Sequence, residues 1–173
     1  MKELEYCLAT AGDIDEMRST LFEHGPNDWN YLPKQGVVQE LKDVADGKAI
    51  GVLAKSEEVM LGFAVAYPRY IHFPKYTDSN DSKEFGYIGD VVIKNEFVGK
   101  GVGTALLEAT KKVLFAYNIR WVDIDCHEEN KPSRGMMRKA GFKEVAIYLD
   151  VERRTVGSCN TWIGRCSTST GIY

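Results

Sequence analysis

Hydrophobic residues recur along this chain with two different periods. Where apolar and polar residues alternate, or where a short apolar run stands between turn residues, the pattern predicts a β-strand. The predicted strands are residues 4–10, 48–55, 59–67, 85–93, 121–126 and 142–151, with a further candidate at 161–166. Where apolar residues recur every three or four positions, the pattern predicts a helix. The predicted helices are residues 11–24, 37–45, 103–117 and 133–140.

Local signals mark the ends of the two N-terminal helices. Thr10 is placed to cap the first helix, with Asp13 as an acidic residue at its positive end, and Gly25-Pro26 ends it. The second helix is predicted to end at Gly47. Its buried face is predicted to contain Val37, Val38, Leu41, Val44 and Ala45.

The resulting order is β-α-α-β-β-β-α-β-α-β-β. The segments 48–55 and 59–67 are separated by only three residues, which predicts an antiparallel hairpin. The order therefore indicates a mixed α/β domain rather than a doubly wound parallel sheet. The length of 173 residues favours one domain over residues 1–173, with the tail 152–173 supplying the final strand. Residues 68–84 are predicted to form a long loop, and loops of that length are usually functional or disordered.

Composition excludes several classes of function. Lys and Arg number 22 against 25 Asp and Glu, a net charge of −3, so no nucleic-acid partner is expected. No apolar run approaches the ~20 residues of a membrane span, and the N-terminus lacks the features of a signal peptide. We therefore expect a cytoplasmic protein with no membrane partner. The four cysteines form no CxxC pair and the three histidines are isolated, so we expect reduced thiols and no metal site.

The three alternating glycines in 99-GKGVG-103 are the strongest chemical signal. A P-loop would require GxxxxGK followed by Ser or Thr, but Lys100 is followed by glycine. A dinucleotide fingerprint has an acidic residue about 20 positions on, which Asp123 and Asp125 satisfy. Against that interpretation, residues 94–98 separate the predicted strand from the first glycine.

A third interpretation is a pyrophosphate-binding turn at a helix N-terminus. Free backbone N–H groups and the positive end of the helix dipole favour a diphosphate there. Glycines at 99, 101 and 103 remove side chains that would block its approach. A simple tight turn with a glycine cap is the remaining interpretation.

Three motifs in order resemble the GNAT superfamily of acyl-CoA-dependent N-acetyltransferases. The stretch 98-VGKGVG-103 is similar to the family signature Arg/Gln-x-x-Gly-x-Gly/Ala. The stretch 130-NKPSRGMMRKAGF-142 is similar to the family's N-x-x-A-x-x-x-Y-x-K-x-G-F, and 10-TAGDIDEM-17 is similar to its first-helix entry. The resemblance covers residues 4–151, and its core motifs lie within 85–142.

The resemblance implies an α/β (α+β) GNAT fold. That fold has a mixed, mostly antiparallel sheet of about six to seven strands, splayed between strands four and five, with about four flanking helices. Gly89 is the expected site of the bulge at the splay. The resemblance also implies acetyl-CoA as co-substrate, without a metal. The residues implied to bind it are Val91, Val92, Ile93, Val98, Gly99, Lys100, Gly101, Val102, Gly103, Thr104, Asn130 and Ser133.

Two positions depart from the family pattern. Val98 replaces the usual Arg or Gln, which removes a polar side chain but keeps the backbone hydrogen bonds. Met137 stands where many members have a tyrosine that protonates the leaving thiolate. Because a thiol with a pKa of about 8.5 is a tolerable leaving group, catalysis is possible without the tyrosine's proton. Water, Cys126 or a tyrosine such as Tyr148 are the alternatives for that proton.

Two carboxylates are candidates for the general base. Asp90 is expected on the fourth strand, in phase with Ile88 and Val92. It ranks first because it is flanked by apolar residues beside Gly89, where burial would raise its pKa. Asp125 matches a glutamate that some protein N-acetyltransferases use. A solvated or ion-paired carboxylate on a strand is the structural alternative for each.

The connection 25–36 is the expected boundary of the acceptor site. Asp28 is placed to attract an ammonium group, and Trp29 and Tyr31 to form an aromatic wall. Aromatic residues that simply pack the loop onto the core are the alternative.

The sequence therefore predicts an N-acetyltransferase that moves an acetyl group from acetyl-CoA to a primary amine of a small molecule or peptide. A homodimer is compatible with this prediction. A non-catalytic CoA-binding sensor and, less favoured, a dinucleotide-dependent oxidoreductase are the alternatives.

Overall fold

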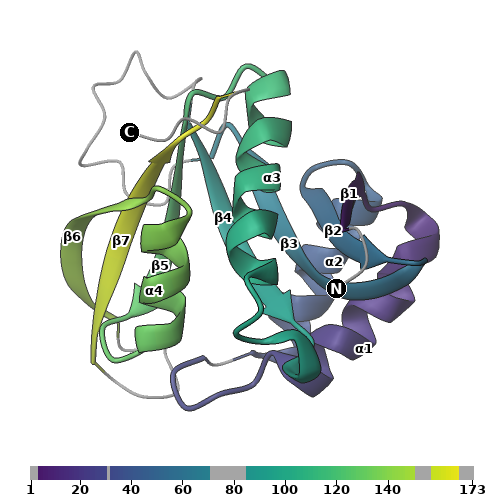
Figure 1. Cartoon of the computed structure of the whole chain (residues 1–173), viewed down its shortest axis with the longest axis horizontal. Helices are drawn as coiled ribbons and strands as arrows, with labels where there is room; N and C mark the ends of the chain where they lie inside the picture. The colour runs from purple at the N-terminus through teal and green to yellow at the C-terminus, as the bar shows by residue number, and fades with distance from the viewer. Residues whose placement is uncertain (1–3, 31, 71–84, 151–156, 168–173) are drawn as a thin grey trace.

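A computed structural model describes residues 4–30, 32–70, 85–150 and 157–167. One sheet contains seven strands in the order β1-β2-β3-β4-β5-β7-β6 (Figure 1). The strands are β1 Glu5–Leu8, β2 Ile50–Ser56, β3 Val59–Pro68, β4 Phe85–Ile93, β5 Trp121–His127, β6 Lys143–Asp150 and β7 Gly157–Arg165. The α-helices are α1 Ile14–His24, α2 Lys34–Ala45, α3 Val102–Ala116 and α4 Lys131–Lys139, and two 3₁₀ turns, η1 Ala11–Asp13 and η4 Asn95–Phe97, precede α1 and α3.

The sheet separates two hydrophobic clusters. Helices α3 and α4 lie in front of the sheet in Figure 1, and they pack with residues such as Ala64 and Ile88. Helices α1 and α2 supply the second cluster, which includes Phe63 and Val65 of β3. Adjacent residues of β3 thus enter opposite clusters, as the two-residue period of a strand requires. The result is a three-layer arrangement in which both faces of the central strands are covered.

The predicted element order and mixed sheet are confirmed. All sheet pairs are antiparallel except β4 with β5, which is parallel. The tail that was expected to supply a final strand contains β7, which inserts between β5 and β6. Residues 71–84 of the predicted long loop lie outside the described residues.

Two predicted helix starts are too late by two or three residues. α2 begins at Lys34 instead of residue 37, directly after Pro33, whose backbone is extended. α4 begins at Lys131 instead of residue 133, because Asn130 caps it and Pro132 fits its first turn. The predicted buried face of α2 is also partly wrong. Val37, Leu41 and Val44 are buried, whereas Val38 and Ala45 are exposed.

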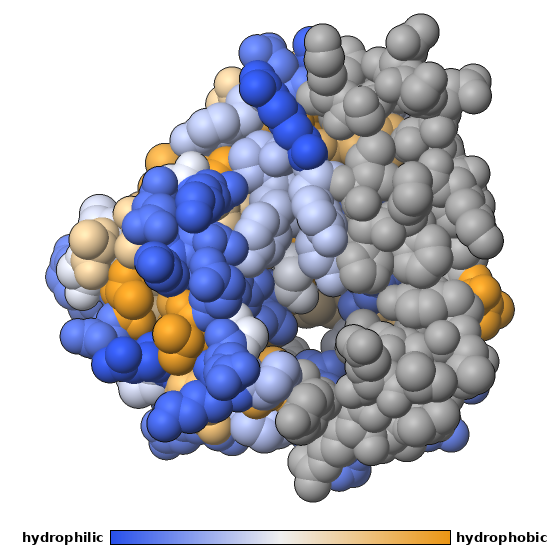
Figure 2. Space-filling view, turned by 180° about the vertical axis from the view of Figure 1, so that it is seen from behind, coloured by the Kyte–Doolittle hydropathy of each residue, from blue (hydrophilic) through white to orange (hydrophobic). Residues whose placement is uncertain are grey.

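The described surface on the side opposite to α3 and α4 is mainly hydrophilic (Figure 2). Apolar residues on that described part form small, separate patches. Within the described ranges, no helix is long and apolar enough to cross a membrane.

A β-bulge in β4 controls how the strand presents its side chains. Val65 of β3 is opposite Asp90, and the next residue, Ala66, is opposite Ile88, so Gly89 is the extra residue. The expected bulge site is therefore confirmed. Because a bulge shifts the alternation by one residue, Ile88 enters the cluster on the α3 side while Val92 enters the cluster on the α2 side. The prediction that Ile88 and Val92 are in phase is wrong for this reason.

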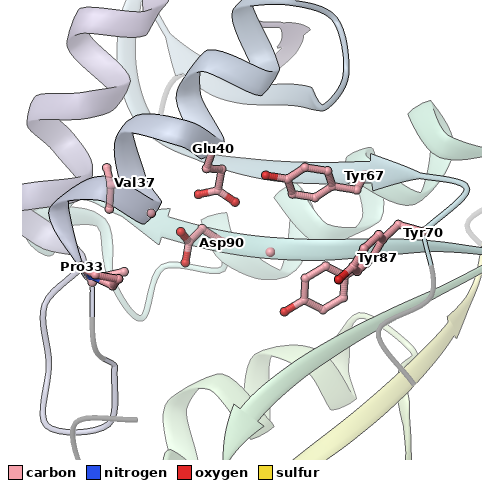
Figure 3. A pocket seen from close by; sticks show the side chains of 10 residues that line it. Pro33, Val37, Glu40, Tyr67, Tyr70, Tyr87 and Asp90 are labelled. Atoms are coloured by element: carbon pink, nitrogen blue, oxygen red, sulfur yellow. The ribbon is translucent and has the colours of Figure 1, made fainter. Parts of the chain in front are cut away.

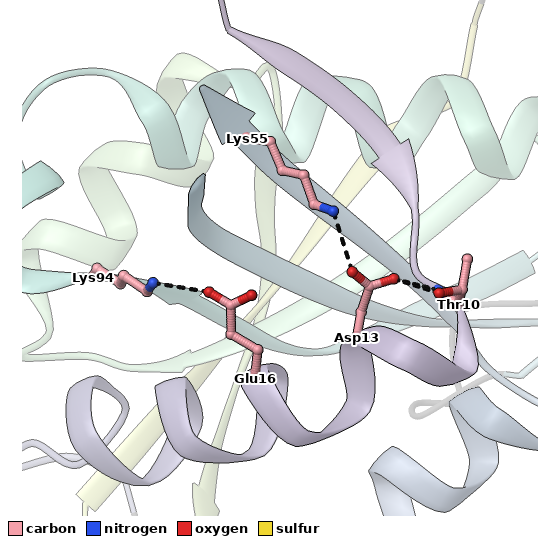
Figure 4. Close-up of polar contacts among 5 residues, drawn as sticks. All are labelled: Thr10, Asp13, Glu16, Lys55 and Lys94. Carbon is pink, nitrogen blue, oxygen red and sulfur yellow. Dashed lines mark hydrogen bonds and ion pairs between the residues drawn. The ribbon is translucent and has the colours of Figure 1, made fainter. Parts of the chain in front are cut away.

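The start of α1 is held by a polar cluster (Figure 4). The carboxylate of Asp13 accepts hydrogen bonds from the backbone N–H of Thr10 (2.8 Å) and from its hydroxyl (2.7 Å). Asp13 also pairs with Lys55 of β2 at 3.2 Å, and Glu16 of α1 pairs with Lys94, just after β4, at 3.2 Å. These contacts fix α1 against the sheet at two places.

Asp13→Ala is expected to lower the free energy of unfolding by about 1 kcal/mol at pH 7, because the helix loses its capping carboxylate. The hydrogen bonds from Thr10 hold the pKa of Asp13 below its usual range. The stabilisation is therefore present above the ordinary Asp pKa of about 4 and is lost as the pH falls through the lower, folded value. Urea unfolding at several pH values measures it. Asp15→Ala, at an exposed surface pair with Arg18, is the control and should change little.

Candidate active site

The glycine loop places unused backbone donors at the start of α3. Gly99 and Gly101 have φ values of +78° and +85°, which glycine adopts without strain. The first helical hydrogen bond runs from the N–H of Ala105 to the carbonyl of Gly101 (3.1 Å). The N–H groups of Val102, Gly103 and Thr104 precede this bond, so the helix itself gives them no acceptor. They form the donor set that an anion at a helix N-terminus requires.

Gly103 has a separate, steric reason to be glycine. A Cβ atom built there would lie 2.6 Å from Sδ of Met136. α3 and α4 therefore approach each other closely at the end of the glycine loop. Val98 and Lys100, which flank Gly99, are exposed, and the Lys100 ammonium lies 5.4 Å from the centre of the Phe97 ring.

β4 and β5 separate just before the glycine loop. Their parallel pairing runs from Phe85 with Trp121 to Ile88 with Ile124 and ends there. β4 continues to Ile93 and stays paired with β3 on its other edge. The edge of β4 over residues 89–93 is therefore unpaired by β5, and the predicted splay between strands four and five is confirmed. The predicted cofactor residues Val91, Val92 and Ile93 belong to this edge.

The predicted cofactor residues Asn130 and Ser133 lie at the start of α4, which directly follows β5. Asn130 is buried at the end of β5, and its side-chain oxygen accepts a hydrogen bond from the N–H of Ser133 (3.1 Å). Met137 is 2% exposed and belongs to the core cluster under α3. At this position the chain has an apolar core side chain that can donate no proton.

A pocket of about 490 Å³ lies on the other face of the sheet, between α2 and β4 (Figure 3). This volume is in the range of small-molecule sites. The residues that line it come from the connection before α2, from α2, and from β3 and β4 with the residues after β3. They are Leu32, Pro33, Gly36, Val37, Glu40, Tyr67, Tyr70, Tyr87, Gly89 and Asp90.

Two carboxyl groups meet in this pocket. The side chains of Glu40 and Asp90 point toward one another in Figure 3 and are hydrogen-bonded. Burial, and then the charge and hydrogen bond of Asp90, raise the pKa of Glu40 to about 10. Two carboxylates this close cannot both be ionised without strong repulsion, so the pair holds one proton at neutral pH.

Three tyrosines form the opposite side of the pocket. The ring centres of Tyr67 and Tyr70 are 6.0 Å apart, and those of Tyr70 and Tyr87 are 5.6 Å apart. The hydroxyl of Tyr67 points toward Glu40 (Figure 3). Burial, and then the charge of Glu40, raise the pKa of Tyr67 above its usual range, so it stays protonated. The pocket therefore combines a carboxyl pair with aromatic faces.

The structure brings Asp90 into this pocket but not the other predicted catalytic and acceptor residues. Asp125 lies on β5 and accepts a hydrogen bond from the Thr161 hydroxyl at 2.8 Å. Asp28 is exposed and Trp29 is half-buried, and neither lines the pocket. Tyr31 lies outside the described residues. Of the connection 25–36, it is the last part, Leu32, Pro33 and Gly36, that reaches the pocket.

Sequence reasoning missed Glu40 and Tyr87, although a local signal for Glu40 exists. Glu40 lies three residues after Val37 and four before Val44, so it interrupts the apolar face of α2 with a carboxyl group. Tyr87 precedes the bulge, and its direction toward α2 depends on the bulge. The proximity of Glu40 and Asp90 has no local signal, because the two residues are 50 positions apart in the sequence.

The described residues contain no group of three or more His, Cys, Asp or Glu side chains that could hold a metal ion.

Comparison with known proteins agrees with this geometry. Residues 14–142 match the model of the acetyltransferase (GNAT) family. An N-alpha-acetyltransferase of Sulfurisphaera tokodaii is 32% identical over 72 residues, which span 39% of this chain and 43% of that relative. The matched region is thus less than half of the relative's length.

Solved structures show the same fold at low sequence identity. AAC(6')-Ib in complex with paromomycin and acetyl-CoA has a TM-score of 0.72 and 19% identity, covering 95% of this chain and 94% of that one. The ribosomal-protein-S5-alanine acetyltransferase of Vibrio fischeri has a TM-score of 0.72 and 14% identity, covering 97% and 96%. With three quarters of its length matched by the family model, the chain belongs to the acetyltransferase (GNAT) family, as its sequence motifs predicted.

Proposed function

We propose that this protein transfers an acetyl group from acetyl-CoA to the amine of a small molecule or peptide. One observation carries the proposal: the bulge at Gly89 places the open edge of β4 and the carboxyl group of Asp90 within a few residues of each other. The strand edge proposed to bind the cofactor and the carboxyl group proposed to receive the amine proton then lie next to each other on β4. The relatives support an amine acceptor, since one is an N-alpha-acetyltransferase and another is bound to paromomycin and acetyl-CoA.

The residues fit acetyl-CoA in three places. The N–H groups of Val102, Gly103 and Thr104 would hold the pyrophosphate, as expected for a diphosphate at a helix N-terminus. The open edge over residues 91–93 would donate and accept hydrogen bonds with the amide groups of pantetheine, as a neighbouring strand does. Asn130 and Ser133 lie at the start of α4, beside the cofactor arm. When bound, acetyl-CoA supplies an acetyl group activated as a thioester.

Asp90 acts as the general base. An amine enters as an ammonium ion and must lose a proton before it can attack a carbonyl carbon. Asp90 accepts that proton, and Glu40 beside it keeps the basicity of the pair above that of an isolated carboxylate. Attack would form the C–N bond, and as the C–S bond breaks the sulfur would leave as a thiolate while the new amide nitrogen loses its remaining extra proton to water. Since Met137 can donate no proton, the thiolate would take its proton from water, which its ordinary pKa of about 8.5 allows.

A non-catalytic CoA-binding protein is the second candidate. The observation that favours it is Met137, buried at 2% exposure where many family members have the acidic tyrosine. Release of free thiol from acetyl-CoA in the presence of an amine panel separates the two functions. If the protein is instead a dinucleotide-dependent oxidoreductase, NAD(P) rather than acetyl-CoA should raise its melting temperature in a thermal-shift assay.

We also propose a cytoplasmic location and a homodimer. The cytoplasmic location is supported by Cys7 and Cys166, which form no disulfide in the described part of the chain. Sedimentation equilibrium measures the assembly state directly.

Gly101→Val is expected to weaken acetyl-CoA binding at least about tenfold, because a β-branched residue is strained at φ +85° and displaces the donor turn. Calorimetry measures the affinity. Gly47→Val is the matched control: Gly47 has φ +73° and open space around its Cβ position, but it lies in the turn after α2. Equal loss of affinity in both variants would contradict the loop assignment.

Asp90→Asn is expected to lower kcat/KM by about 100-fold or more, since a positioned base contributes about 10²–10⁴. The pH dependence of kcat/KM should also differ from that of the wild type, because the variant has no base at this position. Asp125→Asn is the control, because asparagine can still accept the Thr161 hydroxyl. If Asp90→Asn keeps the wild-type profile, Asp90 is not the base.

A further inference from the structure

The acceptor pocket has an unusual charge composition. Its lining contains two carboxyl groups, Glu40 and Asp90, and three phenols, Tyr67, Tyr70 and Tyr87. Among the described residues that line it, none carries a positive charge. A ligand that enters this pocket therefore meets acceptors of hydrogen bonds and aromatic faces, both of which favour a cation.

The position of Glu40 is determined by the bulge. A Cβ atom built on Gly89 would lie 2.6 Å from Oε1 of Glu40. The glycine at the bulge therefore leaves the space that the Glu40 carboxyl group occupies beside Asp90. α2 directs Glu40 into the pocket from the other side, because Val37 and Val44 on the same helix face are buried.

The two carboxyl groups are hydrogen-bonded, which requires a proton between them. The groups that face this proton are Asp43 of α2, Tyr67 of β3, Tyr87 of β4, and Tyr70. Asp43 adds negative charge and the phenols are neutral, so nothing that faces the pair in the described residues favours double ionisation. A cation that binds between the two carboxyl groups can supply the positive charge that this proton provides.

We infer that the pocket selects an ammonium ion, and that Glu40 makes this selection by releasing its proton when the ammonium binds between its carboxyl group and that of Asp90. This inference rests on the proposed function and adds how the acceptor is selected: by exchange of the Glu40 proton for an ammonium ion. One proton leaves Glu40 for the solvent for each ammonium that enters, and no covalent bond changes. A neutral alcohol or amide cannot replace the proton's charge and is rejected.

The exchange has a measurable signature. If one proton is released on binding, affinity for a permanently protonated amine increases about tenfold for each pH unit. Butylammonium is a suitable probe, because an alkylammonium has a pKa near ~10.4 and keeps its charge between pH 6 and 8. 1-Butanol is its neutral counterpart of similar size.

The experiment is calorimetric titration of the ligand-free protein with butylammonium chloride, without acetyl-CoA. We expect affinity to rise about tenfold per pH unit from 6 to 8, with one proton released at pH 7 in two buffers of different ionisation heat. 1-Butanol should bind at least about tenfold more weakly at pH 8. Glu40→Gln, which has the shape of the protonated side chain, should bind butylammonium with no proton release and no pH slope.

Two further variants keep the test decisive. Gly89→Ala retains both carboxyl groups but pushes Glu40 away, so it should also lose the proton release. Asp43→Asn removes a neighbouring charge outside the pocket lining and should keep the wild-type slope. A wild-type affinity independent of pH, equal binding of 1-butanol, no detectable butylammonium binding, or an unchanged slope in Glu40→Gln would each overturn the inference. Failure of acetyl transfer with the exchange intact would overturn only the proposed function.

The ligand-free protein gives an independent prediction. The raised pKa of Glu40 means that the folded state keeps a proton which the unfolded chain loses above about pH 4.3. Stability from this group is therefore greatest at low pH and falls as the pH rises toward the folded value of about 10. The urea midpoint of Glu40→Gln should exceed that of the wild type by an increasing margin between pH 6 and 8. A constant difference would show that the pair holds no proton.

Discussion

The site depends on one extra residue in one strand. Without the bulge at Gly89, β4 would alternate regularly, and Ile88 and Asp90 would face the same side of the sheet. Ile88 is fully buried under α3, so Asp90 would be directed into an apolar core, where an ionised carboxylate is very costly. The bulge instead turns Asp90 toward α2. At the same position β4 separates from β5, which leaves a strand edge open on the side of the glycine loop.

The carboxyl pair shows a conflict between stability and chemistry. Burying Glu40 against Asp90 opposes ionisation of both groups, so the folded protein keeps a proton that water would otherwise remove. That arrangement forms no salt bridge and opposes ionisation of the pair. Stability comes from elsewhere in the chain: α1 is fixed by the Asp13 and Glu16 contacts, and both faces of the sheet carry apolar cores.

The replacement of the family's acidic tyrosine by Met137 is compatible with the rest of the structure. Met137 completes the core under α3, where a hydroxyl group would need a partner. The tyrosines near the proposed reaction centre, Tyr67, Tyr70 and Tyr87, lie on the acceptor side of the sheet instead. The titratable side chains of this region therefore gather in the pocket between α2 and β4, on the opposite face of the sheet from Met137.

The sequence alone determined the element order, the mixed sheet and the glycine loop, because each depends on local periodicity or on the spacing of glycine residues. The resemblance to the family pointed to the bulge at Gly89, whereas regular alternation along β4 wrongly placed Ile88 and Val92 in phase. The first rank of Asp90 among the candidate bases stays a prediction. Only the tertiary structure brought Glu40 to Asp90 and separated Asp28 and Asp125 from the pocket. Such pairs depend on how α2 packs across β4, a contact between segments 50 residues apart that no local pattern encodes.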